Sequence, residues 1–107
     1  MSLPRKIKIY GHDIKVSRKK LDDCYGTFHI DDKSGDGKIC IDKNIDDAHS
    51  ESVLLHEVIH ACLSYSGVVE HLNDALEESI VVALQNGLGP LYERRSNRVA
   101  RDRVSKG

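Results

Sequence analysis

The stretch SVLLHEVIHACL, residues 52–63, places two histidines and a glutamate inside an otherwise apolar segment. On a helix, positions four apart point to the same side, so His56 and His60 can direct their imidazoles at one metal ion. Glu57 is adjacent to the first histidine, where it can act as the base for a metal-bound water without being a ligand. The rest of the stretch has no broad polar side. We therefore predict a buried central helix built around a metal site.

Capping residues and helix breakers indicate that the second half of the chain is helical. A first helix is predicted over about residues 49–66, with Gly67 just after its end. Its candidate N-caps are Asp46, Asp47 and Ser50. A second helix is predicted from about residue 71 to residue 85 or 88, and Pro90 suits the start of a short third helix.

The first third of the chain has the alternating apolar pattern of short strands. Two strands flank Gly11 and His12, as in a tight hairpin, and two more flank a loop that contains glycines. The predicted strands cover residues 6–10, 13–16, 25–31 and 38–42. Strands followed by helices indicate an α+β fold, with the helices packed on one small antiparallel or mixed sheet.

Length and charge limit the organisation of the chain and its partners. The 107 residues suffice for one domain, predicted at residues 1–93 and followed by a basic tail at residues 94–107. The net charge of −1 gives no general argument for nucleic acid. The segment from Arg94 to Lys106, however, has five arginines and one lysine against Asp102. Nucleic-acid binding by this tail is the weaker alternative to a solvated tail.

The cysteines and the apolar pattern favour a reducing compartment. Cys24, Cys40 and Cys62 form no CxxC pair, as expected of free thiols. The first residues lack the apolar stretch of a signal peptide, and no segment has the roughly 18 apolar residues that a membrane span requires. We therefore expect a cytoplasmic protein without a membrane partner.

A catalytic zinc site needs a third protein ligand and an open coordination position. In one extended form of the motif a third histidine follows six residues after His60, but that position here is Ser66. His71 is geometrically possible, without a known pattern behind it. Glu77 and Glu78 lie about 17 residues after His60, which suits a site of two histidines and one glutamate.

Helix periodicity distinguishes the two glutamates. Glu77 shares one side of its helix with Ile80, Val81, Leu84 and Leu88. Glu78 lies beside Asp74, Val82 and Gln85, a more polar side. Because a carboxylate on an inward side is costly unless it binds a cation, we predict Glu77 as the third ligand and keep Glu78 as the alternative. The predicted ion is one Zn²⁺ per chain, although this ligand set also suits Fe(II) or Mn(II).

The motif resembles that of a known enzyme family. His56, Glu57, His60 and a glutamate on the next helix resemble the gluzincin metallopeptidases. More narrowly, LLHEVIHACL followed by EESIVVALQNGL is similar to small phage-encoded metallopeptidases of the ImmA/IrrE type, over roughly residues 5–92. The resemblance implies a minimal zincin fold, with an HExxH helix, a third-ligand helix and the strand at Lys38–Asp42 as a rim for an extended peptide. For a phage-encoded chain it also implies the host cytoplasm.

The chain departs from the larger gluzincins in one respect. Those proteins often carry an aspartate four residues after the ligand glutamate, hydrogen-bonded to a zinc-binding histidine, and here that position is Val81. Candidates to stabilise an oxyanion are Tyr65, His71 and His29. We expect zinc-dependent hydrolysis of a peptide or protein substrate, with Glu57 as general base. The alternative is a regulatory or interaction protein on a zincin scaffold, catalytically weak or inactive.

Overall fold

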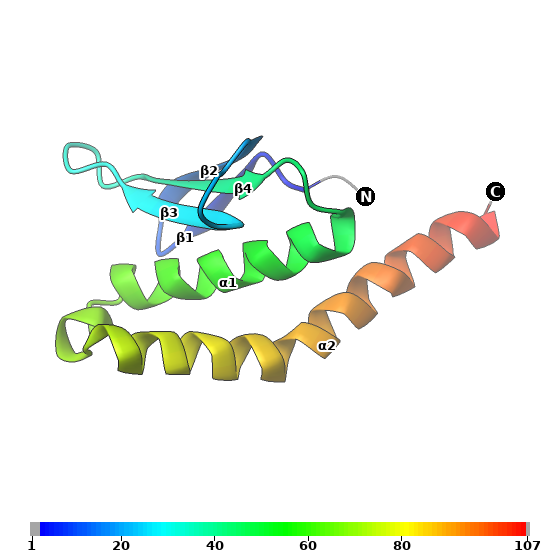
Figure 1. Cartoon of the computed structure of the whole chain (residues 1–107). Coiled ribbons are helices and arrows are strands. Elements are labelled where there is room, and N and C mark those ends of the chain that lie inside the picture. Colours follow the sequence, from blue (N-terminus) through cyan, green and yellow to red (C-terminus); the bar gives the residue numbers. More distant parts are fainter. Residues whose placement is uncertain (1–2, 107) are drawn as a thin grey trace.

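The chain folds into a four-stranded mixed sheet followed by two helices, which confirms the α+β class (Figure 1). The computed structural model describes residues 3–106, with side chains described as far as Leu91. The elements in chain order are β1 (Lys6–Ile9), β2 (His12–Lys19), β3 (Gly26–Ile30), β4 (Gly37–Asp42), α1 (Asp47–Tyr65), the 3₁₀ helix η1 (Val68–His71) and α2 (Asp74–Lys106).

Two antiparallel hairpins, β1–β2 and β3–β4, build the sheet, as the alternating pattern predicts. The first hairpin turns at Tyr10 and Gly11, whose φ angles of 50° and 79° are those of a tight two-residue hairpin turn. The hairpins join through β2 and β4, which run parallel, so the strand order is β1-β2-β4-β3. β4 is therefore paired on both sides, and β1 and β3 are the two edge strands. The expectation that Lys38–Asp42 forms a peptide-binding rim is wrong, because its backbone groups are used within the sheet.

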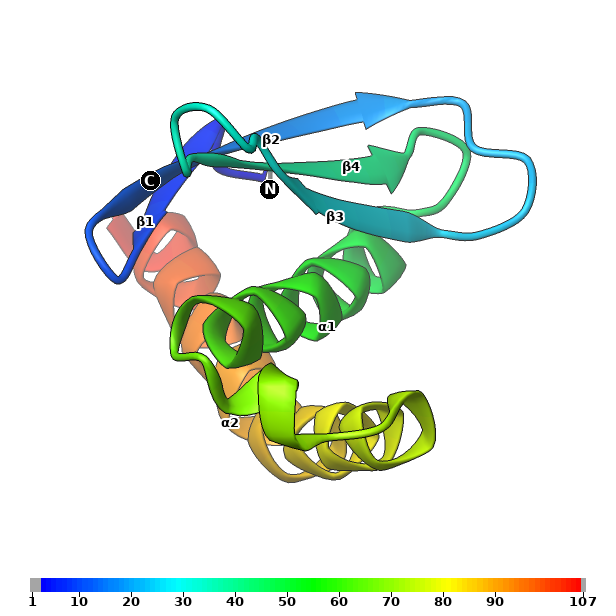
Figure 2. The same cartoon turned by 90° about the vertical axis from the view of Figure 1, so that its left-hand side faces the viewer.

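α1 is the central element, as predicted. Asp46 caps it, since its Oδ1 accepts a hydrogen bond of 2.7 Å from the backbone N–H of His49. The helix ends at Tyr65, and Gly67 follows with a φ of 82°. One side of α1 packs on the sheet, where Leu54 and Ala61 join the isoleucine core of β2 and β4. The opposite side contacts α2, so α1 lies between the sheet and the second helix (Figure 2).

α2 is longer than predicted. Asn73 precedes its first residue and caps it, since the Asn73 Oδ1 accepts a 2.8 Å hydrogen bond from the N–H of Leu76. The helix then continues through Pro90 to Lys106. The predicted end near residue 88 and the separate third helix are therefore wrong. A helix interior accommodates proline by bending, and Figure 1 shows α2 changing direction partway along.

The boundary predicted at residue 93 falls inside α2, and the side chains of the basic tail lie outside the described residues. Within the part of the chain that the structure describes, no helix combines the length and the apolar character needed to cross a membrane.

Gly37 marks the closest packing of β4, and Gly37→Ala is expected to lower the free energy of unfolding by about 1–3 kcal/mol. A Cβ there would lie 2.7 Å from Cδ1 of Ile14 and 2.9 Å from the hydroxyl oxygen of Tyr65. Gly87→Ala is the control, because nothing lies within 4 Å of its Cβ position in α2. In a helix this change is expected to stabilise by up to about 1 kcal/mol. Urea unfolding measures both variants, and equal effects would contradict this packing.

Candidate metal centre

His56 and His60 lie on the side of α1 that faces α2, with their ring centroids 4.9 Å apart. The Nε2 atom of His56 is 3.3 Å from Oε1 of Glu78, and Nε2 of His60 is 3.3 Å from Oε2 of the same carboxylate. One ligand atom from each of the three residues lies within 4.8 Å of the other two. His56, His60 and Glu78 therefore form a group that could hold a metal ion.

The dimensions of this group suit a small divalent cation. Ligand atoms at about 2.0–2.2 Å from a tetrahedral ion lie about 3.3–3.6 Å from one another. The two nitrogen–oxygen distances of 3.3 Å match this spacing before any ion is added. The side chain of Glu78 is 54% exposed, so the group opens to solvent on the α2 side. Two imidazoles and one carboxylate are also the donor set of many catalytic zinc sites.

The other ring nitrogen of each histidine is held by α2. Nδ1 of His60 is 2.6 Å from Oε2 of Glu77, and Nδ1 of His56 is 2.8 Å from Oε1 of Gln85. Gln85 donates its Nε2 hydrogens to the carbonyl and hydroxyl oxygens of Ser52, which leaves Oε1 as the acceptor. Both Nδ1 atoms are therefore hydrogen-bond donors.

These contacts determine which way the lone pairs of the histidines point. With hydrogen on Nδ1, a neutral imidazole presents the lone pair of Nε2, and here both Nε2 atoms face the oxygens of Glu78. Acceptors that face one another at 3.3 Å repel unless a cation lies between them. That cation is either a metal ion or a proton on each ring. The arrangement of His56, His60 and Glu78 is thus a site for positive charge.

The structure assigns the two glutamates different positions. Glu78 joins the two Nε2 atoms, whereas Glu77, our predicted third ligand, contacts the far nitrogen of His60. The side of α2 that carries Glu78 and Gln85 looks polar in sequence but faces α1. The apolar pattern therefore predicts the wrong inward side of α2 at this point, because the residues that face His56 and His60 are polar. Gln85, seven positions after Glu78, was the signal that could have revealed this face.

Glu77 and Gln85 take the role that an aspartate at position 81 has in the larger gluzincins. Residue 81 here is a fully buried valine, which cannot accept a hydrogen bond from a metal-binding histidine. Hydrogen bonds to the remaining ring nitrogen orient metal-binding histidines and raise their basicity. In this chain a carboxylate and an amide on α2 occupy those positions, and no aspartate at residue 81 is needed.

Glu57 is buried between α1 and the edge strand β3, with 7% of its surface exposed. Burial raises the pKa of its carboxyl group, and the nearby charges of His60 and His56 oppose that rise. β3 approaches closely here because of Gly26, where a Cβ would lie 3.2 Å from Cγ of Glu57. A buried carboxylate with a raised pKa is a stronger base than an exposed one.

A cavity of about 300 Å³ adjoins this position. His56 and Glu57 line one part of it, and Tyr25, Gly26 and Val53 line another. Its size matches the small end of ligand pockets, enough for one side chain of a bound peptide. The cavity thus brings the histidine–glutamate motif and the start of β3 to one shared space.

The three candidates for oxyanion stabilisation differ in their surroundings. Tyr65 donates a 2.8 Å hydrogen bond to the carbonyl of Gly35 and stacks on His12, so its hydroxyl has a structural role. His71 ends η1, at the turn between the two helices. His29 lies on β3, close enough for its charge to act on the pKa of Glu57. Of the three, only His29 is on an element beside the buried glutamate.

Comparison of the chain with protein-family models, with curated proteins and with solved structures finds no match in any of the three. Function is therefore inferred from the geometry of His56, His60 and Glu78 and from the position of Glu57 beside them.

Proposed function

We propose that this protein is a zinc-dependent peptide hydrolase, with His56, His60 and Glu78 as zinc ligands and Glu57 as general base. The proposal rests on one observation: the Nε2 atoms of His56 and His60 each lie 3.3 Å from an oxygen of the Glu78 carboxylate. The hydrogen bonds that the two Nδ1 atoms donate to Gln85 and Glu77 support it, because they orient both rings with Nε2 toward Glu78. Glu78 replaces Glu77 as the proposed third ligand for this reason.

Each residue of the site has a definite task in such a reaction. A zinc ion bound there would polarise the substrate carbonyl and lower the pKa of water. Glu57 accepts a proton from the attacking water and then passes it to the leaving amine. Glu77 and Gln85 hold the imidazoles in place throughout. The raised pKa of Glu57 supports the proton-transfer role, since proton exchange is most efficient when the pKa of the base approaches the working pH.

The free edge of β3 supports a peptide as the substrate. An edge strand offers unpaired backbone N–H and C=O groups, to which an extended chain can add as a further strand. Gly26 begins this edge directly beside Glu57, and the adjoining cavity can take one substrate side chain. A peptide bound along β3 would therefore pass the proposed base.

The alternative is a metal-binding interaction protein on the same scaffold. The engagement of Tyr65 with Gly35 favours it, because that hydroxyl is then unable to stabilise an oxyanion. In this version the edge of β3 would hold a protein segment without cleaving it. Turnover distinguishes the two proposals.

The test is to purify the full chain without added metal, add zinc in steps, and assay a quenched-fluorescence peptide library. We expect one zinc per chain, and stabilisation of about 2.7 kcal/mol when free zinc exceeds its dissociation constant 100-fold. Peptide cleavage should appear with zinc and disappear with a chelator. Zinc binding without cleavage would favour the interaction protein. Absence of zinc binding would reject both proposals.

A further inference from the structure

A row of apolar side chains follows one side of α2. Its members recur every three or four residues, which is the spacing of one helix face: Leu76, Ile80, Leu84, Leu88 and Leu91. We call these five residues the apolar row. Its four leucines keep between 42% and 64% of their surface exposed. Monomeric soluble proteins rarely leave large continuous apolar surfaces in water, so the apolar row indicates an interface.

The apolar row lies apart from the metal centre. Val81 is fully buried and marks the side of α2 that faces α1. Around the helix axis, Glu78 and Gln85 lie to one side of Val81, whereas Leu84 and Leu88 lie to the other. A partner that covers the apolar row would therefore leave Glu78 open to solvent.

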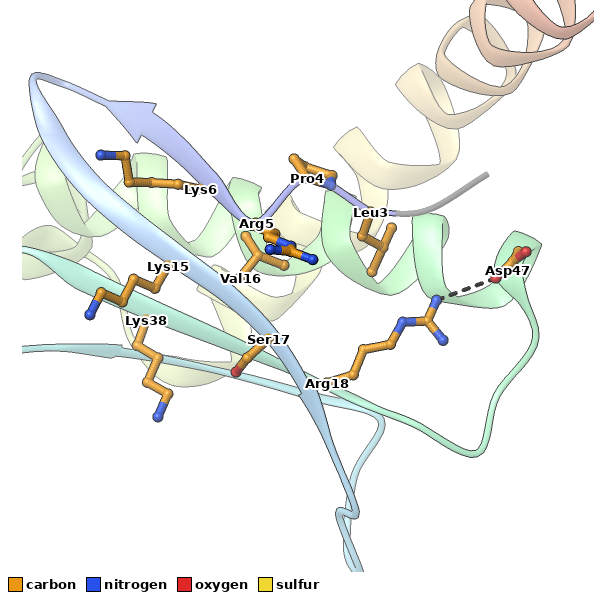
Figure 3. Close-up of a pocket in the computed structure, with 10 residues that line it drawn as sticks. All are labelled: Leu3, Pro4, Arg5, Lys6, Lys15, Val16, Ser17, Arg18, Lys38 and Asp47. Atoms are coloured by element: carbon orange, nitrogen blue, oxygen red, sulfur yellow. Dashed lines mark hydrogen bonds and ion pairs between the residues drawn. The ribbon is translucent and has the colours of Figure 1, made fainter.

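α1 lies beside only the first half of α2. The two helices run antiparallel, and Gln85 donates hydrogen bonds to Ser52, five residues after α1 begins. The first residue of α1, Asp47, is held 3.5 Å from Arg18 of β2 (Figure 3). Residues 91–106 of α2 therefore extend past the start of α1, as Figure 1 shows. Because helices in proteins gain most of their stability from packing, this half of α2 is the part that a partner would stabilise.

Opposite charges occupy the two ends of α2. The helix begins with the acids Asp74, Glu77 and Glu78, and residues 79–92 carry no charged side chain. Residues 94–106 then carry five arginines and one lysine against one aspartate. A second α2 packed in parallel would place like charges together. A second α2 packed antiparallel would place each acidic start beside a basic end, and such complementary charges set the orientation of paired helices.

We propose that the protein forms a homodimer in which the α2 helices of two copies pack antiparallel along their apolar rows, independently of the metal centre. With the two-fold axis at residue 86, Leu84 of one copy lies opposite Leu88 of the other. The same register brings Asp74 opposite Arg98. Because the axis is two-fold, each of these contacts occurs twice. The dimer thus covers the apolar rows and pairs the opposite charges at both ends of the helices.

The test measures sedimentation equilibrium of the metal-free full chain. The paired segment, residues 74–98, is about 37 Å long, a small interface, so we expect a dissociation constant of about 1–100 μM. Leu88→Glu/Leu91→Glu should weaken dimerisation by more than about 100-fold, because each dimer would bury four charges in an apolar contact. Circular dichroism should show the helices retained, since both leucines are exposed in the single chain. Leu91→Glu alone, at the most exposed position of the apolar row, repeats the test if the double variant does not fold.

Val68→Glu/Val82→Glu is the matched control. These two valines are 44% and 41% exposed and lie outside the apolar row, and the change adds the same charge. Val82 neighbours Glu78 on the other side of α2. We expect the control to change the dissociation constant by less than about threefold, because salt screens distant charges.

A charge exchange tests the antiparallel orientation. Arg98→Glu and Asp74→Lys should each weaken their own dimer about 10-fold, because like charges then face one another at both ends. An equimolar mixture of the two variants should dimerise within about threefold of wild type, because every facing pair is again opposite in charge. The proposal is overturned if the chain stays monomeric at about 200 μM, above the expected dissociation constant. It is also overturned if Leu88→Glu/Leu91→Glu dimerises like wild type, if mixing restores nothing, or if the apolar row binds anionic lipid vesicles while the chain stays monomeric.

Discussion

Glu57→Gln is expected to lower the rate of peptide hydrolysis by about 10²–10⁴-fold while zinc binding stays unchanged. Glutamine keeps the size of the side chain but cannot accept and return the proton. Glu57 is not among the three residues whose ligand atoms converge, so its replacement leaves the zinc ligands intact. Zinc affinity by competitive titration and hydrolysis of a cleaved library peptide are measured on the same preparation.

Two controls make this result specific. Glu51→Gln is the same chemical change at an earlier position on α1, and we expect it to retain activity. The metal-free Glu57→Gln protein should unfold at the same or higher urea concentration than wild type. This follows because burial raises the pKa of Glu57, so the charged form destabilises the fold at neutral pH. Undiminished cleavage by Glu57→Gln would reject Glu57 as the base.

Local pattern predicts much of this fold. The two hairpins follow from alternation and turn glycines, and α1 follows from Asp46, Gly67 and the apolar run between them. The facing of His56 and His60 follows from helical geometry alone. Each of these features depends on residues close in sequence, where the chemistry of caps, turns and periodicity is decisive.

Features set by distant contacts are not predictable in the same way. The parallel pairing of β2 with β4 leaves β1 and β3 as the edge strands, and no residue within either hairpin specifies which strand of one hairpin pairs with which strand of the other. The rotation of α2 about its axis depends on packing against α1, and it decides between Glu77 and Glu78. Pro90 suggests a helix boundary by local rules, yet the helix continues past it. The sequence thus predicts the positions of His56, Glu57 and His60, but it does not decide whether Glu77 or Glu78 is the third ligand.

The third ligand can be decided by comparing three isosteric variants. Glu78→Gln is expected to weaken zinc binding by more than about 100-fold, because it removes the charge of a ligand, whereas a group that only orients a ligand costs less. Glu77→Gln should cost about 10–100-fold, the range typical of such an orienting group. Glu70→Gln, at an exposed glutamate of η1, is the control and should bind zinc like wild type. Competition with a chromophoric chelator measures all three.

The order of the first two variants distinguishes the roles of the two glutamates. The amide oxygen introduced by Glu77→Gln could still accept the hydrogen bond from Nδ1 of His60, so a ligand-orienting role predicts partial loss. A larger loss in Glu77→Gln than in Glu78→Gln would mean that His60 turns when zinc binds and that Glu77 becomes the ligand. Unchanged zinc binding in both variants would mean that neither glutamate is a zinc ligand, which would reject the proposed site of His56, His60 and Glu78. A larger loss of zinc affinity in Glu78→Gln than in Glu77→Gln is expected only if both histidines bind zinc in their present orientation. In that orientation Nε2 points toward Glu78, and Nδ1 points toward Glu77 or Gln85.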